Sequence, residues 1–204
     1  NIPILLGTQM VAKGLDFENV TLVGVLDADL SLYVQNYHAA ERTYSLLAQV
    51  VGRAGRGERA GRAVIQTYHP ENEVIQAAAK QDYEAFYQSE LRLRRLRRYP
   101  PFADLFTLTV SGSEELRVIA AARTLCDALR CESEREPLRA LETEVLGPAG
   151  APVVKVNDRY RYCVYLCGRS DSALRRTVSE YLLAFYARKE NRGLDIFADC
   201  NALQ

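Results

Sequence analysis

The chain has 204 residues, and its 26 lysines and arginines balance its 26 aspartates and glutamates. This length fits one large domain or two small ones. A hydrophobic content of 48% with 25% charged residues is ordinary for a globular protein and argues against a disordered chain. Zero formal net charge excludes attachment to nucleic acid by bulk positive charge alone, although it leaves room for local basic patches.

The apolar segments are strand-sized. Residues 20–26 are typical of them, and they fall far short of the roughly 20 residues that span a bilayer. No signal peptide is evident, so a cytoplasmic location is the default. The cysteines are odd in number and contain no C-x2-C pair, which argues against a zinc site or a disulfide framework. Because the chain opens at Asn1 without a lead-in, we expect it to belong to a longer protein.

Residues 2–68 alternate strand with helix. We expect strands at 4–6, 20–26 and 63–68 and a helix over 39–51 that ends at Gly52. Apolar strands separated by helices predict a parallel sheet covered on both faces. In such sheets the ligand crevice lies at the carboxyl ends of the strands. The residues expected on that rim are Gly7, Thr8, Asp27, Asp29 and His69.

The rest of the chain reads as one long helix followed by a β-α-β-β-α-β domain. The helix covers about residues 71–98 and ends at Pro100-Pro101, where we place a domain boundary. Two βαβ-like halves then predict a small ferredoxin-like α+β sandwich. Its strands are expected at 105–110, 145–148, 153–156, 162–166 and 194–197, with a hairpin turn at Asn157-Asp158 and helices over 114–131 and 171–188.

The first chemical motif follows the first expected strand and reads Gly7-Thr8-Gln9-Met10-Val11-Ala12-Lys13-Gly14-Leu15-Asp16-Phe17. Its glycines allow close backbone approach. Thr8, Gln9 and Lys13 are able to donate hydrogen bonds to phosphate oxygens, and Asp16 is able to accept one from a ribose hydroxyl. The alternative is an ordinary strand-to-helix loop with polar rim residues.

The second motif is Gln49-Val50-Val51-Gly52-Arg53-Ala54-Gly55-Arg56-Gly57. Two guanidinium groups three residues apart, set among glycines, suit phosphate oxygens. The pattern is typical of arginine-finger chemistry, in which charge on a transferring phosphoryl group is neutralised. A glycine-rich turn with solvated arginines is the alternative.

Two further segments are basic. Residues 92–98 hold five arginines, including Arg92 and Arg95, and predict either a surface that follows a phosphate backbone or a solvated helix end. In the expected hairpin, Lys155, Arg159 and Arg161 alternate with tyrosines, which suits single-stranded nucleic acid. Ordinary cross-strand tyrosine packing with exposed arginines is the alternative for the hairpin.

Together, the first two motifs resemble motifs V and VI of the superfamily 2 helicases. Other segments narrow the resemblance: Leu26-Asp27-Ala28-Asp29, Ala40-Glu41-Arg42, Gln66-Thr67-Tyr68-His69-Pro70, Tyr99-Pro100-Pro101-Phe102 and Leu146-Gly147-Pro148. Over essentially its whole length the chain resembles the C-terminal part of the bacterial PriA (primosomal protein N′) family of replication-restart helicases. One departure is Asp199-Cys200-Asn201-Ala202, with alanine where the family often has proline.

The resemblance implies a domain organisation. Residues 1–70 would form a partial RecA-like second helicase lobe, a parallel sheet truncated on its N-terminal side. Residues 71–101 would link it to a small ferredoxin-like, ribosomal-protein-like domain over 102–204 that binds DNA or protein partners. The intact protein would be an ATP-dependent 3′→5′ DNA helicase that binds stalled or branched forks and initiates primosome assembly.

Site residues follow from the same resemblance. Arg56 is implied to be the arginine finger on the γ-phosphate, with Arg53 supporting it and Gln49 orienting the network. Gly14 and Asp16 are implied to lie near the nucleotide, and Asp27 and Asp29 to hold the arginines apart. The residues implied to contact DNA are Gly7, Thr8, Gln9, Lys13, Arg92, Arg95, Lys155, Arg159 and Arg161.

The implied cofactors are ATP and Mg²⁺ in the intact protein, held mainly by a first lobe upstream of Asn1, and zinc bound by upstream cysteines. No cofactor or metal is expected in this chain alone, and it should lack ATPase activity. The implied partners are branched and single-stranded DNA, single-stranded DNA-binding protein and other primosome proteins, without a membrane. The alternative function is a non-catalytic DNA- or protein-binding module of another superfamily 2 repair translocase.

Overall fold

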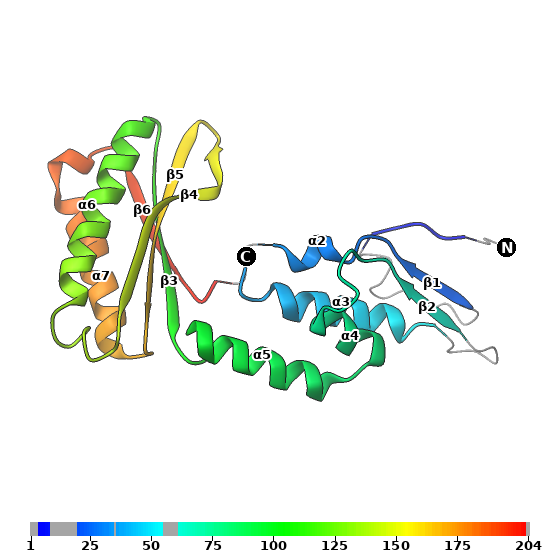
Figure 1. Cartoon of the computed structure of the whole chain (residues 1–204). Coiled ribbons are helices and arrows are strands. Elements are labelled where there is room, and N and C mark those ends of the chain that lie inside the picture. The colour runs from blue at the N-terminus through cyan, green and yellow to red at the C-terminus, as the bar shows by residue number, and fades with distance from the viewer. Residues whose placement is uncertain (1–3, 9–19, 35, 55–60, 203–204) are drawn as a thin grey trace. The chain divides into compact units, whose positions relative to one another are not determined.

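The computed structural model describes residues 4–8, 20–34, 36–54 and 61–202. The chain divides into two compact units, Asn1–Leu93 and Arg94–Gln204, and the division falls inside a helix (Figure 1). Each unit has its own hydrophobic core. The sequence-based boundary at Pro100-Pro101 stays a prediction.

The first unit combines a short parallel sheet with helices. Strands β1 (Leu22–Val25) and β2 (Arg62–Ile65) pair in parallel, with Val23 opposite Ala63. The helices are α2 (Asp29–Leu32), α3 (Ala39–Val51), α4 (Glu73–Lys80) and α5 (Tyr83–Arg97). Tyr44 of α3 stacks on Phe86 of α5 with ring centroids 4.3 Å apart, at the centre of the apolar cluster. The parallel sheet predicted from the sequence is confirmed.

This sheet is smaller and more open than expected. Residues 4–6 are exposed and form no strand, because nothing in the described part of the chain pairs with them. Val25 and Ile65 pack against the helical core, whereas Leu22 is 63% exposed and Val64 45% exposed on the other face. Helices of the described residues thus cover one face of β1 and β2, and the expectation of two covered faces is wrong here.

The expected long helix over residues 71–98 is in fact two helices. Asn72 begins α4, since its side-chain oxygen accepts hydrogen bonds from the backbone N–H groups of Val74 and Ile75 at 2.9 and 3.4 Å. Gln81 ends it in the left-handed conformation, with φ 55°. Asp82 then caps α5 by accepting a hydrogen bond from the N–H of Ala85 at 2.9 Å.

The second unit is the predicted β-α-β-β-α-β sandwich. In chain order its elements are β3 (Asp104–Gly112), α6 (Glu115–Ser133), β4 (Glu144–Val156), β5 (Arg159–Gly168), α7 (Ser172–Ala187), η1 (Lys189–Asn191) and β6 (Asp195–Cys200). The antiparallel sheet has the strand order β4-β5-β3-β6, which is ferredoxin-like. Helices α6 and α7 lie on the same side of this sheet (Figure 1).

The core of the second unit fills the space between the helices and the sheet. Leu108 of β3, Val164 of β5, Val118 of α6 and Leu174 of α7 are fully buried there. The hairpin turn is where the sequence places it, because Asn157 and Asp158 both have positive φ, as an Asn-Asp turn between twisted strands requires. The two short strands expected at 145–156 are instead one irregular strand, β4.

The described part of the chain contains no helix that is both long and apolar enough to cross a membrane.

Candidate nucleotide and DNA sites

The end of α3 carries the described part of the arginine motif. Gly52 closes the helix by donating its backbone N–H to the carbonyl of Ala48 at 2.9 Å. The N–H groups of Arg53 and Ala54 then bond to the carbonyls of Val50 and Val51 at 3.1 and 3.2 Å, so the chain continues in tight turns. Arg53 is therefore held in a fixed relation to α3. Gln49 is exposed on the last turn and Arg53 is partly exposed.

Many residues of the two phosphate motifs lie outside the part of the chain that the structure describes. Gly55, Arg56 and Gly57 lie outside the described residues. So do Gln9, Lys13, Gly14 and Asp16 of the first motif. Gly7 and Thr8 are described, exposed and without regular secondary structure. The structure therefore places Gln49 and Arg53 at the end of α3, and the roles of all the motif residues stay predictions.

Asp29 joins the carboxyl ends of the two parallel strands. It lies just beyond β1 and is 5% exposed. Its carboxylate accepts hydrogen bonds from the Thr67 hydroxyl and from the Tyr68 N–H, both at 2.9 Å and both just beyond β2. Asp29 thereby stabilises the strand ends on the rim, and the expectation that it holds the arginines apart stays a prediction. Asp27, its expected companion, is exposed.

The arginines of residues 92–98 do not form one uniform surface. Arg94 is 7% exposed and donates a hydrogen bond to the carbonyl of Pro100 at 3.1 Å. The guanidinium carbon of Arg95 lies 4.9 Å from the centre of the Phe102 ring. Arg98 forms an ion pair with Glu142 at 3.7 Å. Arg92 and Arg97 are exposed, as is Arg95, so these three remain candidates for phosphate contact.

The basic residues of the β4–β5 hairpin all have intramolecular partners. Arg159 donates to the carbonyl of Ser111 at 3.3 Å and forms an ion pair with Asp195. Arg161 donates from Nε and Nη2 to the carbonyl of Val153 at 3.2 and 2.8 Å. These contacts fix the hairpin to the sheet, and both arginines stay partly exposed.

Lys155 is an exposed basic residue of the hairpin. Its Nζ lies 3.1 Å from the carboxylate of Asp158 and 5.1 Å from the centre of the Tyr160 ring. The hydrogen bond to Asp158 and the charges of Tyr160 and Asp158 raise the pKa of Lys155, so it stays positive at neutral pH.

The hairpin tyrosines pack against the core of the second unit. Tyr160 and Tyr162 pack against the hydrophobic core on the helix side of the sheet. The Tyr162 hydroxyl donates a hydrogen bond to Glu115 at 2.8 Å, and this bond is the main reason why the pKa of Tyr162 is raised. These contacts favour the packing interpretation of the tyrosines, and a role of the hairpin in DNA binding stays a prediction.

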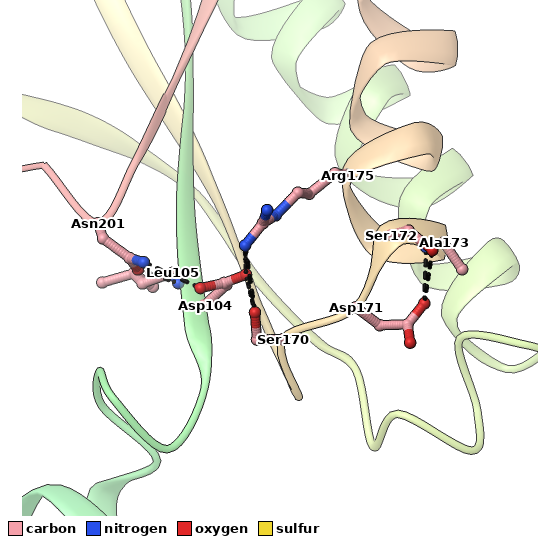
Figure 2. Close-up of polar contacts among 8 residues, drawn as sticks. All are labelled: Asp104, Leu105, Ser170, Asp171, Ser172, Ala173, Arg175 and Asn201. Atoms are coloured by element: carbon pink, nitrogen blue, oxygen red, sulfur yellow. Dashed lines mark hydrogen bonds and ion pairs between the residues drawn. The ribbon is translucent and has the colours of Figure 1, made fainter.

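One polar cluster was not predicted from the sequence. Asp104, at the start of β3, accepts hydrogen bonds from Ser170 at 2.7 Å, from Arg175 at 3.1 Å and from the side-chain amide of Asn201 at 2.9 Å (Figure 2). Asn201 in turn accepts a hydrogen bond from the N–H of Leu105 at 2.8 Å. The cluster joins the start of β3, the beginning of α7 and the end of β6. The only sequence signal was Asn201 beside the unusual Ala202.

Arg53 is partly exposed as a residue, and its Nε is buried. In the described part of the chain no three His, Cys, Asp or Glu side chains are grouped so as to hold a metal ion. The five cysteines are free thiols, and burial raises the pKa of Cys126, Cys167 and Cys200.

A parallel sheet with an arginine-bearing turn, followed by a ferredoxin-like domain, defines the C-terminal part of a helicase-class protein. Sequence profiles agree: residues 1–58 match the helicase conserved C-terminal domain and residues 95–201 match the primosomal protein N C-terminal domain. The chain belongs to the PriA family of replication restart proteins and corresponds to their C-terminal part.

Three relatives illustrate the similarity. The replication restart protein PriA of Bacillus subtilis is 40% identical over 198 residues, which is 97% of this chain and 24% of the relative. The protein of the same name from Synechocystis is 42% identical over 162 residues, 78% of this chain and 18% of the relative. That of Treponema pallidum is 36% identical over 186 residues, 91% and 27% of the two chains. The chain thus spans about a quarter or less of these relatives.

Proposed function

We propose that this chain is the C-terminal part of an ATP-dependent 3′→5′ DNA helicase that binds stalled or branched replication forks and initiates primosome assembly for replication restart. Its first unit contributes the arginines that face the γ-phosphate of ATP. Its second unit contributes basic surface to DNA binding.

The observation that supports this most directly is the position of Arg53. The residue follows α3 without an intervening loop, and its backbone is hydrogen-bonded into the last turns of that helix. An arginine whose backbone is fixed at the end of a helix suits a role in which charge on a transferring phosphoryl group must be neutralised. The match of residues 1–58 to a helicase domain supports the same role.

The remaining components would come from outside this chain. The sequence contains no G-x-x-x-x-G-K-[ST] loop and no D-E-x-H segment. We propose that ATP and Mg²⁺ are held mainly by an upstream lobe and that zinc is bound by upstream cysteines. The proposed partners are branched and single-stranded DNA, single-stranded DNA-binding protein and other primosome proteins.

The alternative is a non-catalytic binding module of a different superfamily 2 translocase. The match of residues 95–201 to the primosomal protein N domain argues against it.

The experiment compares ATP hydrolysis by residues 1–204 and by the full-length protein, each with and without forked DNA. The full-length protein should hydrolyse ATP in a DNA-stimulated manner, and the isolated chain should not, because it holds only one side of the nucleotide site. DNA-stimulated turnover by residues 1–204 that disappears with Arg56→Ala would refute the assignment of the nucleotide site to two lobes.

A further inference from the structure

Gln81 occupies a backbone position that normally belongs to glycine. It ends α4 in the left-handed conformation, with φ 55° and ψ 30°. Its N–H bonds to the carbonyl of Ala78 at 3.1 Å, and the N–H of Asp82 bonds to that of Ala77 at 2.9 Å. This pair of bonds is a Schellman motif, in which glycine is the usual residue because a Cβ is unfavourable at positive φ. A glutamine at this position stores some backbone strain, which contacts of its side chain can offset.

The side chain reaches the end of α3. Its Nε2 donates a hydrogen bond at 3.5 Å to the carbonyl of Ala48, the same carbonyl that accepts the N–H of Gly52 at 2.9 Å. A Cβ on Gly52 would lie only 3.0 Å from that Nε2 and 3.2 Å from the Ala48 carbonyl oxygen. The absence of a side chain at Gly52 therefore allows Gln81 to approach the last turn of α3.

This contact acts on the part of α3 that leads to the arginines. Arg53 follows Gly52 directly, and its N–H bonds back to Val50 within the same turn. Any tilt of the last turn of α3 would therefore move Arg53 with it. Gly52, the first glycine of the arginine motif, thus leaves room for the Gln81 side chain beside the last turn of α3.

We propose that Gln81 is a positioning residue for the arginine motif: its amide holds the end of α3 so that Arg53 points correctly at the nucleotide. This inference rests on the proposed function. It predicts that loss of the amide lowers kcat for ATP hydrolysis and leaves substrate binding unchanged, because the inferred effect of Gln81 acts through the end of α3.

The test uses the full-length protein with Gln81→Gly and Gln81→Glu. Glycine suits the left-handed backbone and removes the side chain, whereas glutamate keeps its length but cannot donate to the Ala48 carbonyl. Glu142→Gly is the matched control, because Glu142 also has positive φ, 52°, and lies in the other unit. Both Gln81 variants should lower kcat about tenfold through misplacement of the arginine, with KM for ATP and fork affinity unchanged. Glu142→Gly should keep wild-type kcat.

The unfolding temperature distinguishes a positioning role of Gln81 from a role in folding. Gln81→Gly should unfold at the same temperature as wild type or higher, because it relieves the left-handed strain. A kcat loss that comes with a clear fall in unfolding temperature would overturn the positioning role. So would wild-type kcat in both Gln81 variants.

The contact itself has an independent test in residues 1–204. Gly52→Ala should lower the unfolding temperature in the wild-type background and lower it less in a Gln81→Gly background, since the new methyl group then has room. Equal effects in the two backgrounds would overturn the contact.

The Arg56→Ala variant distinguishes a failure of the Gln81 inference from a failure of the proposed function. If Arg56→Ala abolishes hydrolysis while the Gln81 variants behave as wild type, only the role of Gln81 is wrong. If Arg56→Ala has no effect on hydrolysis, the proposed nucleotide site is wrong as well.

Discussion

The side-chain amide of Asn201 donates a hydrogen bond to the carboxylate of Asp104 at 2.9 Å, which ties the end of the last strand to the start of the first strand of the second unit (Figure 2). The opposite oxygen of the same carboxylate accepts hydrogen bonds from Ser170 and Arg175. Asp104 is 6% exposed, so its charge depends on these partners.

The stability of the second unit should therefore fall in acid. Burial alone raises the pKa of Asp104, but the hydrogen bonds from Ser170, Asn201 and Arg175 and the charge of Arg175 outweigh it, and the net pKa lies below its usual value. A carboxyl with a lower pKa in the folded state stabilises the fold above its unfolded pKa of about 3.9. This stabilisation is lost as the pH falls through the lower, folded pKa.

Urea unfolding of residues 1–204 between pH 7 and pH 2 measures this effect, with Asp104→Asn as the comparison. The variant should be less stable than wild type at pH 7, by about 2 kcal/mol because a buried hydrogen-bonded charge is lost. The difference should shrink as the pH falls and wild-type Asp104 takes up a proton. A difference that stays constant with pH would show that the charge of Asp104 does not stabilise the fold.

Asn201→Ala should cost about 1–2 kcal/mol, because it leaves Asp104 and the N–H of Leu105 each without one hydrogen bond. The measurement is the free energy of unfolding of the single variants and of the double variant with Asp104→Ala. The two effects should be less than additive, since both substitutions remove the same bond. Full additivity would mean that the two side chains act independently.

The exposed arginines of α5 should carry salt-dependent DNA affinity. Replacing Arg92, Arg95 and Arg97 by alanine should reduce the slope of log affinity against log salt by about 2–3. The reason is that each lost phosphate contact releases about one counterion fewer on binding. Arg123, Arg135 and Arg176 are the control, because they are exposed arginines elsewhere in the chain. If both triple variants change the slope equally, the α5 arginines are ordinary surface charge.

Two substitutions in the β4–β5 hairpin should change DNA affinity in opposite directions. Lys155→Ala should weaken DNA binding, whereas Asp158→Gly should strengthen it by releasing Lys155 from its ion pair. Glycine suits the positive φ of Asp158, and the Asp158 side chain is 96% exposed, so the turn should be retained. The measurement is fluorescence anisotropy with labelled forked DNA. Unchanged affinity in both variants would remove the hairpin from the DNA-binding surface.

The fold was predictable where local patterns and tertiary packing agree. Helix α3 spans the predicted residues 39–51, and the Asn157-Asp158 turn and the β-α-β-β-α-β order are also as predicted. In each case apolar periodicity and turn residues point to the same structure, so no long-range contact has to override them.

The failures come from contacts that the sequence does not display. Gln81 is a good helix former, and only its contact with α3 reveals why the helix breaks there. The hydrogen bonds of Asp29 and Asp104 were not predictable, because their partners are 38 to 97 residues away along the chain. Arg94 could not be told from its exposed neighbours until its burial was known.

The central claim is that arginines after α3 act on the γ-phosphate of ATP, and the most direct test is hydrolysis and fork binding by full-length Arg56→Ala protein, measured on the same preparation. DNA-stimulated hydrolysis should fall by about 10³-fold or more, with the fork Kd within about threefold of wild type because the residue is not assigned to DNA. Hydrolysis at the wild-type rate, or an equal collapse of fork binding, would contradict the account.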